Sequence, residues 1–171
     1  DYVSEKPQVE IVAGAKGVFA IEVFDQDMQG EPGSDRRILD VLSRFKVRFM
    51  SKDTNANTIT HYVDTTLKHV KRVVKALEEE FPNAEISTRK VALVSAIGSD
   101  MKVPGILARS VKSLADNDIS VLAIHQCMRQ VDIQFVVDED KYDQAIVALH
   151  GALIEPHNHE YAIVAASTTA G

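Results

Sequence analysis

The sequence predicts an α+β protein built from two ferredoxin-like βαββαβ domains, each an antiparallel four-stranded sheet with its helices on one face. Two observations predict this fold class: an internal repeat, and an apolar pattern that switches between strand and helix periods. Residues 18–81 and 91–153 carry the same order of signals, and Pro32-Gly33 recurs 72 positions later as Pro104-Gly105. Two copies of one pattern predict a pseudo-symmetric pair of small domains.

The first copy is expected over residues 17–88. An apolar run at 18–23 predicts a strand, and Ser34 is the expected N-cap of a helix whose apolar stripe ends at Phe45. Strands are expected at 47–50 and 58–63 because Val, Ile, Thr and Tyr are enriched there. The remaining expected elements are a helix over 67–81, stopped by Pro82, and a closing strand at 84–88.

The second copy is expected over residues 90–155 and repeats this order. Its strands are predicted at 91–96, 120–124, 132–137 and 161–165, and its helices at 106–114 and 142–149. The alternation of Ile133, Phe135 and Val137 places them on one face of their strand. In the first of its helices, Leu107, Val111 and Leu114 are expected on the apolar side.

Composition excludes several classes of function. The formal net charge is −6, and the basic residues form no stripe with interleaved aromatics, so we expect no nucleic-acid partner. We expect no membrane segment, since no apolar run approaches the ~18 residues that span a bilayer. Cys127 is the single cysteine, which fits a reducing cytoplasm. The chain begins at Asp1, which suggests a fragment of a longer protein.

Two loops carry the most informative pattern. The segment 24–33 and its counterpart 98–105 each contain Asp-Met and end in Pro-Gly where a helix is expected to begin. Free backbone N–H groups and the positive helix dipole favour a small carboxylate at such a point. An Asp on the same loop could pair with an ammonium group. Either the loops bind a free amino acid, or Pro-Gly only starts a helix after a turn; the recurrence favours the first interpretation.

Other polar groups indicate less. His157 and His159 could supply half of a metal site, but no further ligand has suitable spacing, so no metal is expected. Cys127 lies near His125 without a third group to orient the pair, and a small semi-buried hydrophobe is the better interpretation. The cations of residues 68–75 resemble a basic patch, but the solvated face of a helix is the better interpretation.

Short motifs resemble the regulatory region of aspartate kinases, which consists of tandem ACT domains. The resemblance is carried by 91–98 leading to Met101 and Pro104-Gly105, by 114–121, by 135–138 and by 148–150. It extends from about Val18 to Ala165. The glycine-rich opening of the kinase domain, of Lys-Phe-Gly-Gly-Thr-Ser type, is absent from this sequence.

The resemblance implies an allosteric region without catalytic residues or cofactors of its own. Such regions sense lysine, threonine or both, while an attached kinase, on the same or a partner chain, phosphorylates the side-chain carboxylate of aspartate with ATP and Mg²⁺. The resemblance also implies that the final strand, at 160–166, can complete the first domain. Apolar residues on both faces of several strands additionally predict a homodimer paired through these domains.

Effector contacts are implied by position only. In the first copy they are Asp25, Met28, Gly33, Ser34, Phe49, Met50, Asp53, Thr54 and Asn55. In the second copy they are Asp100, Met101, Pro104, Gly105, Ile106, Leu107, Val121, Leu122 and Gln126. Many relatives have a Ser-Thr-Ser-Glu-like turn where this chain has 52–55 and 125–128, so the identity of the effector stays open.

Two other functions compete with this one. The same pair of domains could regulate a different enzyme of amino-acid metabolism. A small hydrolase or metal enzyme that uses His125, His157 and His159 is the alternative from another class. Zinc analysis would separate this enzyme from a sensor.

Overall fold

Strands and helices alternate along the chain in the predicted order. The computed structural model describes residues 9–28, 32–98, 101, 105–129 and 131–155. The described residues fall into two compact units, one within residues 17–91 and the other within residues 9–16 and 92–155. Two strands, β1 (Val9–Phe24) and β4 (Glu85–Gly98), contribute residues to both units.

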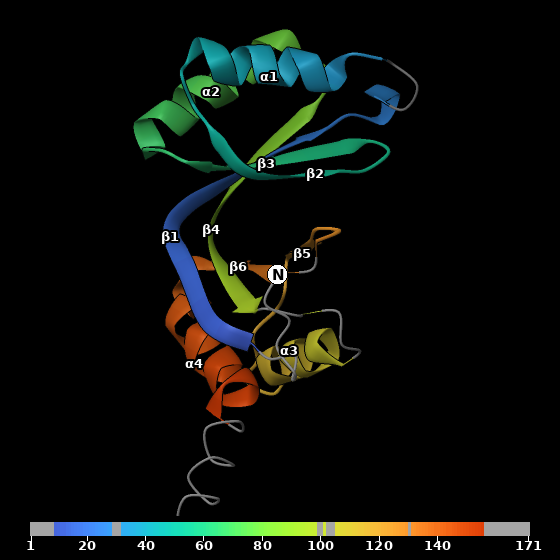
Figure 1. Ribbon diagram of the computed structural model, residues 1–171. Helices are drawn as coiled ribbons and strands as arrows, with labels where there is room; N and C mark the ends of the chain where they lie inside the picture. The colour runs from blue at the N-terminus through green and yellow to red at the C-terminus, as the bar shows by residue number, and fades with distance from the viewer. Residues whose placement is uncertain (1–8, 29–31, 99–100, 102–104, 130, 156–171) are drawn as a thin grey trace, which may run out of the picture. The chain divides into compact units, whose positions relative to one another are not determined.

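In the unit of residues 17–91, hydrogen-bonded neighbours follow the order β2-β3-β1-β4. Here β2 is Phe49–Thr54 and β3 is Thr58–Asp64. β3 pairs antiparallel with both neighbours, Val18 lying opposite Asp64 and Phe24 opposite Thr58. The helices α1 (Ser34–Arg44) and α2 (Leu67–Glu80) lie together on one face of these strands (Figure 1). The predicted βαββαβ order is confirmed.

The core of this unit lies between the helices and the sheet. Ile21 and Val23 of β1 and Ile59 and Val63 of β3 are buried, and the members of each pair lie an even number of positions apart because alternate strand residues share a face. Each helix supplies an apolar stripe with a spacing of three to four residues. The buried apolar helix residues are Ile38, Val41, Leu42, Val70, Val73, Ala76 and Leu77.

The second unit repeats this arrangement with strand order β1-β4-β6-β5. β5 is Ala123–Gln126 and β6 is Asp132–Asp138, and they pair antiparallel with Ala123 opposite Val136. The helices are α3 (Ile106–Ala115) and α4 (Tyr142–Leu153). Its core residues include Ala92, Leu114, Ile133, Phe135 and Leu149.

The edge position beside β4 in this unit is filled by residues 9–16, a segment for which the sequence predicts no strand. Close packing shows how tightly it is held: a Cβ built on Gly14 lies 2.6 Å from the carbonyl oxygen of Leu93 and 2.6 Å from the ring of Tyr142. Lys16 also pairs with Asp143 at 3.2 Å. The strand predicted at 161–165 lies outside the described residues.

Several element boundaries differ from the expectations. β4 is one continuous strand, whereas two strands were expected at 84–88 and 91–96. The N-cap of α1 is Gly33, and Ser34 is its buried first residue, so the expected cap is wrong. In α3 the buried side comprises Ile106, Ser110 and Leu114, while Leu107 is 39% exposed. Among the described residues, no helix has the length and apolar character needed to cross a membrane.

Candidate ligand site

Both Pro-Gly loops deliver the chain into a helix through a glycine. Gly33 precedes α1 and Gly105 precedes α3, and each has φ of 103°, a conformation that side chains rarely adopt. The backbone N–H groups of the first turn of α1 have no acceptors within the helix. Since α1 has 11 residues, its dipole favours negative charge at this end.

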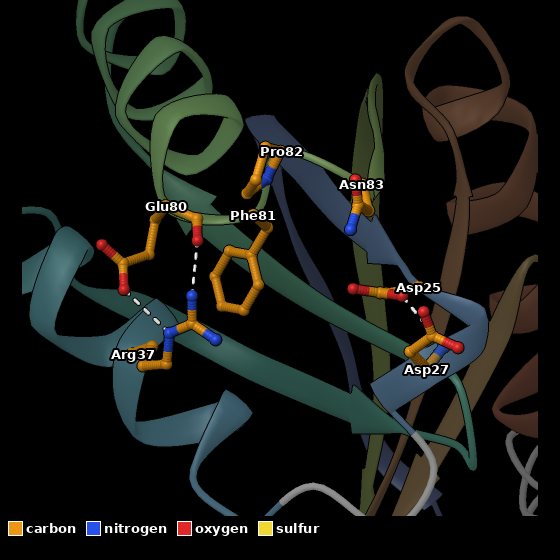
Figure 2. A pocket seen from close by; sticks show the side chains of 7 residues that line it. All are labelled: Asp25, Asp27, Arg37, Glu80, Phe81, Pro82 and Asn83. Atoms are coloured by element: carbon orange, nitrogen blue, oxygen red, sulfur yellow. Dashed lines mark hydrogen bonds and ion pairs between the residues drawn. The ribbon is translucent and has the colours of Figure 1, made fainter.

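A pocket of about 190 Å³ lies beside this loop (Figure 2). It is lined by Asp25 and Asp27 after β1, Arg37 of α1, Glu80 at the end of α2, and Phe81, Pro82 and Asn83. The three lining segments meet because α1 and α2 run so that the start of one lies near the end of the other. The pocket is thus formed by three separate segments and lies at one of the two loops that the sequence singles out.

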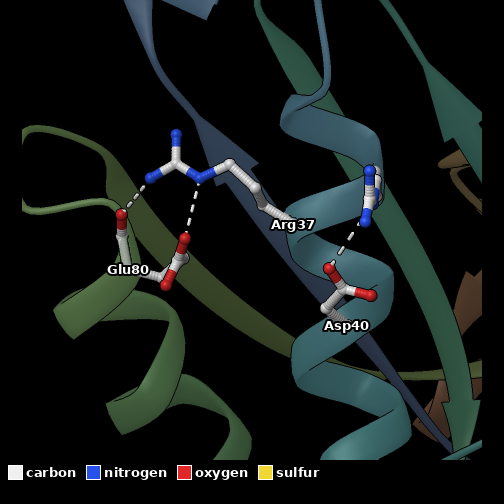
Figure 3. A network of polar contacts seen from close by, with 4 residues as sticks. Arg37, Asp40 and Glu80 are labelled. Carbon is white, nitrogen blue, oxygen red and sulfur yellow. Dashed lines mark hydrogen bonds and ion pairs between the residues drawn. The ribbon is translucent and has the colours of Figure 1, made fainter.

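Arg37 forms one wall and is held in place from two sides. Its Nε donates to Glu80 Oε1 at 2.8 Å, and an Nη donates to the Glu80 carbonyl oxygen (Figures 2 and 3). The guanidinium carbon lies 4.3 Å from the centre of the Phe81 ring, a cation–π contact. Asp40, one turn along α1, lies outside the pocket and pairs at 3.8 Å with Arg36. These contacts hold the Arg37 guanidinium in one position at the side of the pocket.

Asp25 and Asp27 form the facing wall. The Asp25 N–H donates to the Asn57 carbonyl at 2.9 Å, and the Asp27 N–H donates to Asp25 Oδ1 at 2.9 Å. These bonds fix the short loop and leave the Asp27 carboxylate without a hydrogen bond to any described residue. Three carboxylates and one guanidinium line the pocket, so its formal charge is −2. Such a pocket suits a ligand with more positive than negative charge.

The other candidates of the first copy are dispersed. Met28 is buried in the core, whereas Phe49 and Met50 on β2 are 43% and 47% exposed. Asp53 accepts a 2.6 Å hydrogen bond from the Tyr62 hydroxyl. Asn55 closes the β2–β3 turn through its N–H to the Thr58 carbonyl. Thr54 is exposed at the end of β2.

In the second copy the loop itself is only partly described. Asp100 and Pro104 lie outside the described residues. Met101 and Ile106 are buried in the core, and Val121 is partly buried against it. Leu122, just before β5, and Gln126, at the end of β5, are exposed. These candidates remain predictions.

A second polar group lies on the helix-covered side of β2 and β3. Lys52 and His61 are cross-strand partners, and Lys52 Nζ lies 2.6 Å from Asp35 Oδ2 in the first turn of α1. His61 is 1% exposed, its ring meets Phe49 edge-on at 5.1 Å, and its Nε2 has no hydrogen-bond partner in the described structure. Burial, then the Lys52 charge, lower the pKa of His61 to about 4, against a smaller opposite effect of Asp35.

The opposite face of the same strands carries Tyr62 and Asp53. Burial first, and then the hydrogen bond to Asp53, raise the pKa of the Tyr62 hydroxyl above its ordinary value. Asp53 therefore serves as an acceptor for Tyr62 on this face, whereas its neighbour Lys52 faces α1.

Sequence reasoning missed Arg37, Glu80 and Asn83 as pocket residues. A signal existed for the first two, because antiparallel helices place the start of one against the end of the other, and these positions carry opposite charges. Nothing in the pattern marks Asn83. No group of three metal-ligating side chains occurs in the described ranges, and His157 and His159 lie outside them.

Comparison with known proteins identifies the class of protein to which this geometry corresponds. Residues 94–153 match the ACT domain family. The chain is 54% identical over 166 residues to aspartate kinase Ask_Ect of Stutzerimonas stutzeri (strain A1501), covering 97% of this chain and 35% of that protein. It superimposes with a TM-score of 0.74 on the regulatory subunit of aspartate kinase from Thermus flavus, at 17% identity, over 85% of this chain and 98% of that one.

A third match is aspartokinase III of E. coli in complex with lysine and aspartate, with a TM-score of 0.74 and 16% identity, over 89% of this chain and 35% of that one. The chain has the ACT fold, and its residues 94–153 match the ACT domain family. More particularly, the 54% identity to aspartate kinase Ask_Ect confirms the resemblance to aspartate kinases found in the sequence. The chain spans about a third of the length of aspartate kinase Ask_Ect.

Proposed function

We propose that this chain is the amino-acid-sensing part of an aspartate kinase, and that the pocket beside the β1–α1 loop binds the effector. The carrying observation is the pocket itself: two loop carboxylates, Asp25 and Asp27, face a guanidinium that two bonds to Glu80 hold in place. An effector ammonium would pair with Asp27, and its carboxylate would approach the outer edge of Arg37.

Lysine is the preferred effector and threonine the second candidate. The pocket has a formal charge of −2, and lysine carries two ammonium groups and one carboxylate at neutral pH. Threonine carries one of each and would leave the pocket charge at −2, whereas lysine would reduce it to −1. The lysine complex of E. coli aspartokinase III agrees with this order of preference.

The parent protein proposed here phosphorylates aspartate with ATP and Mg²⁺ in a kinase domain that precedes this region or belongs to a partner chain. We place it in the cytoplasm and propose that two copies pair through their ACT domains. The edge strands support pairing of two copies. Phe49 and Met50 are exposed on β2, Ile124 is exposed on β5, and Leu122 is exposed just before β5. Exposed apolar edges of this kind are typical of interaction surfaces.

Titration calorimetry of lysine into the parent chain and into Asp27→Asn tests the pocket. The loss of one charge-assisted hydrogen bond corresponds to about 1.5–3 kcal/mol, so Asp27→Asn should weaken lysine binding about ten- to a hundredfold. Asp40→Asn is the matched control, because it removes the same charge from α1 outside the pocket. Equal affinities in parent and Asp27→Asn would remove the effector from this pocket.

A further inference from the structure

A second concavity of about 350 Å³ lies along the exposed side of α1 and α2. Its walls are Arg44 and Phe45 at the end of α1, and Arg72, Lys75, Ala76 and Glu79 of α2. The side chains of Arg44, Arg72 and Lys75 are exposed, while Ala76 is buried and Phe45 is half-buried. Three cations and the carboxylate of Glu79 thus surround an apolar floor, and the formal charge of the lining is +2.

These cations lack partners inside the protein. Across the described ranges, neither Arg44, Arg72 nor Lys75 makes a hydrogen bond or an ion pair. Other basic residues of the chain do: Arg37 pairs with Glu80, and Lys52 pairs with Asp35. In a chain of net charge −6, three unpaired cations around one concavity form a local positive site.

The basic residues of α2 do not stabilise the helix in which they lie. Lys68, Lys71, Arg72 and Lys75 follow one another at helical spacing on one face, where like charges three and four residues apart repel. The first turn of α2 contains no acidic residue and its last turn no basic residue, which is the reverse of what the helix dipole favours. The fold is held by the opposite face of α2, through Val70, Val73 and Leu77.

We propose that this concavity, the Arg44–Arg72–Lys75 groove, binds a small phosphate-bearing molecule. Two guanidinium forks and one ammonium match the oxygen geometry and charge of a phosphate or diphosphate. The ring of Phe45 and the methyl group of Ala76 offer apolar contact for the organic part of the ligand. The groove shares no lining residue with the pocket of Asp25 and Asp27, so the chain would bind a second, anionic ligand at a separate site.

The probes are pyrophosphate and ADP, titrated by calorimetry into the 171-residue chain at physiological salt, with adenosine as the uncharged comparison. Pyrophosphate and ADP should bind with Kd below about 1 mM, and adenosine should not bind detectably. Arg72→Gln should weaken the binding of both anions about tenfold or more. Arg72→Lys keeps the charge but loses the two parallel N–H donors, so its affinities should lie between those of the parent chain and Arg72→Gln. Lysine affinity should stay at the parental value in both variants.

Lys68→Gln is the matched control, since it removes one charge from the same helix outside the groove. It should weaken anion binding less than Arg72→Gln does, because Lys68 does not line the groove and an exposed charge one helical turn away contributes only a screened interaction. The proposal is overturned by the absence of pyrophosphate binding at about 10 mM, or by equal losses in Lys68→Gln and Arg72→Gln. It is also overturned if hexaglutamate binds more tightly than pyrophosphate and displaces it, since the groove would then receive an acidic protein segment.

Discussion

Acid should weaken the fold through His61, the buried histidine beneath the first turn of α1. The ring is almost fully buried, its Nε2 is unpartnered, and the Lys52 ammonium lies on the facing strand position. All three features oppose a positive charge on the ring, which explains a pKa near 4 in place of the ordinary 6.5. The folded protein therefore holds His61 neutral where the unfolded chain would bind a proton.

The size and sign of the effect follow from this difference. Above pH 6.5 neither state protonates His61, and its contribution to stability is complete. As the pH falls from 6.5 to about 4, the unfolded state gains a proton that the folded state does not, so the free energy of unfolding decreases. At 1.36 kcal/mol for each pH unit, the loss approaches about 3 kcal/mol at pH 4.

Urea unfolding of the parent chain and of His61→Leu, followed from pH 7.5 to pH 4, measures this loss. The variant cannot take up the proton in either state, so its stability should fall by about 3 kcal/mol less than that of the parent over this interval. Ile59→Val, a buried change on the same strand, is the control and should cost about 0.5–1.5 kcal/mol equally at every pH. Parallel pH profiles for the parent and His61→Leu would refute the assignment.

Three further predictions can be tested on the same material. Gly33→Ala and Gly105→Ala should each destabilise the chain by about 1–3 kcal/mol in urea unfolding, because φ is 103° at both positions, and an unchanged midpoint would contradict that backbone geometry. Gly14→Ala should also lower the unfolding midpoint, since the new Cβ meets the Leu93 carbonyl at 2.6 Å; a neutral result would mean that residues 9–16 do not pack there. Light scattering should give about twice the 18.8 kDa monomer mass, and a strictly monomeric chain at tens of micromolar would exclude pairing.

The sequence was sufficient for the order of the elements because the apolar periods are strong. The stripe of α1 and the alternation in β6 correspond directly to the buried residues Ile38, Val41, Ile133 and Phe135. The first half of β1 was missed because residues 9–16 mix Glu, Gly and Lys with apolar residues, which hides the strand period. Its place is set by tertiary contacts with Leu93 and Tyr142, which local patterns do not encode.

The pocket could be predicted only in part, for a related reason. Asp25 and Asp27 lie in a polar segment whose Gly and Pro residues predict a loop, and the recurrence of this loop in the second copy indicated where a ligand could bind. Arg37 and Glu80 lie 43 positions apart and meet only because α1 packs against α2. Burial of Met28 likewise depends on the packing of the loop over the core rather than on its sequence neighbours.

Thermal melting of the chain with each of the twenty amino acids at millimolar concentration tests the central claim most directly. A ligand that binds only the folded state raises its stability by RT ln(1 + [L]/Kd), about 2.7 kcal/mol at a hundredfold excess over Kd. Lysine should give the largest increase in melting temperature, and Asp27→Asn should reduce it while Asp40→Asn should not. An unchanged melting temperature with all twenty amino acids would contradict the proposal that this ACT region senses an amino acid.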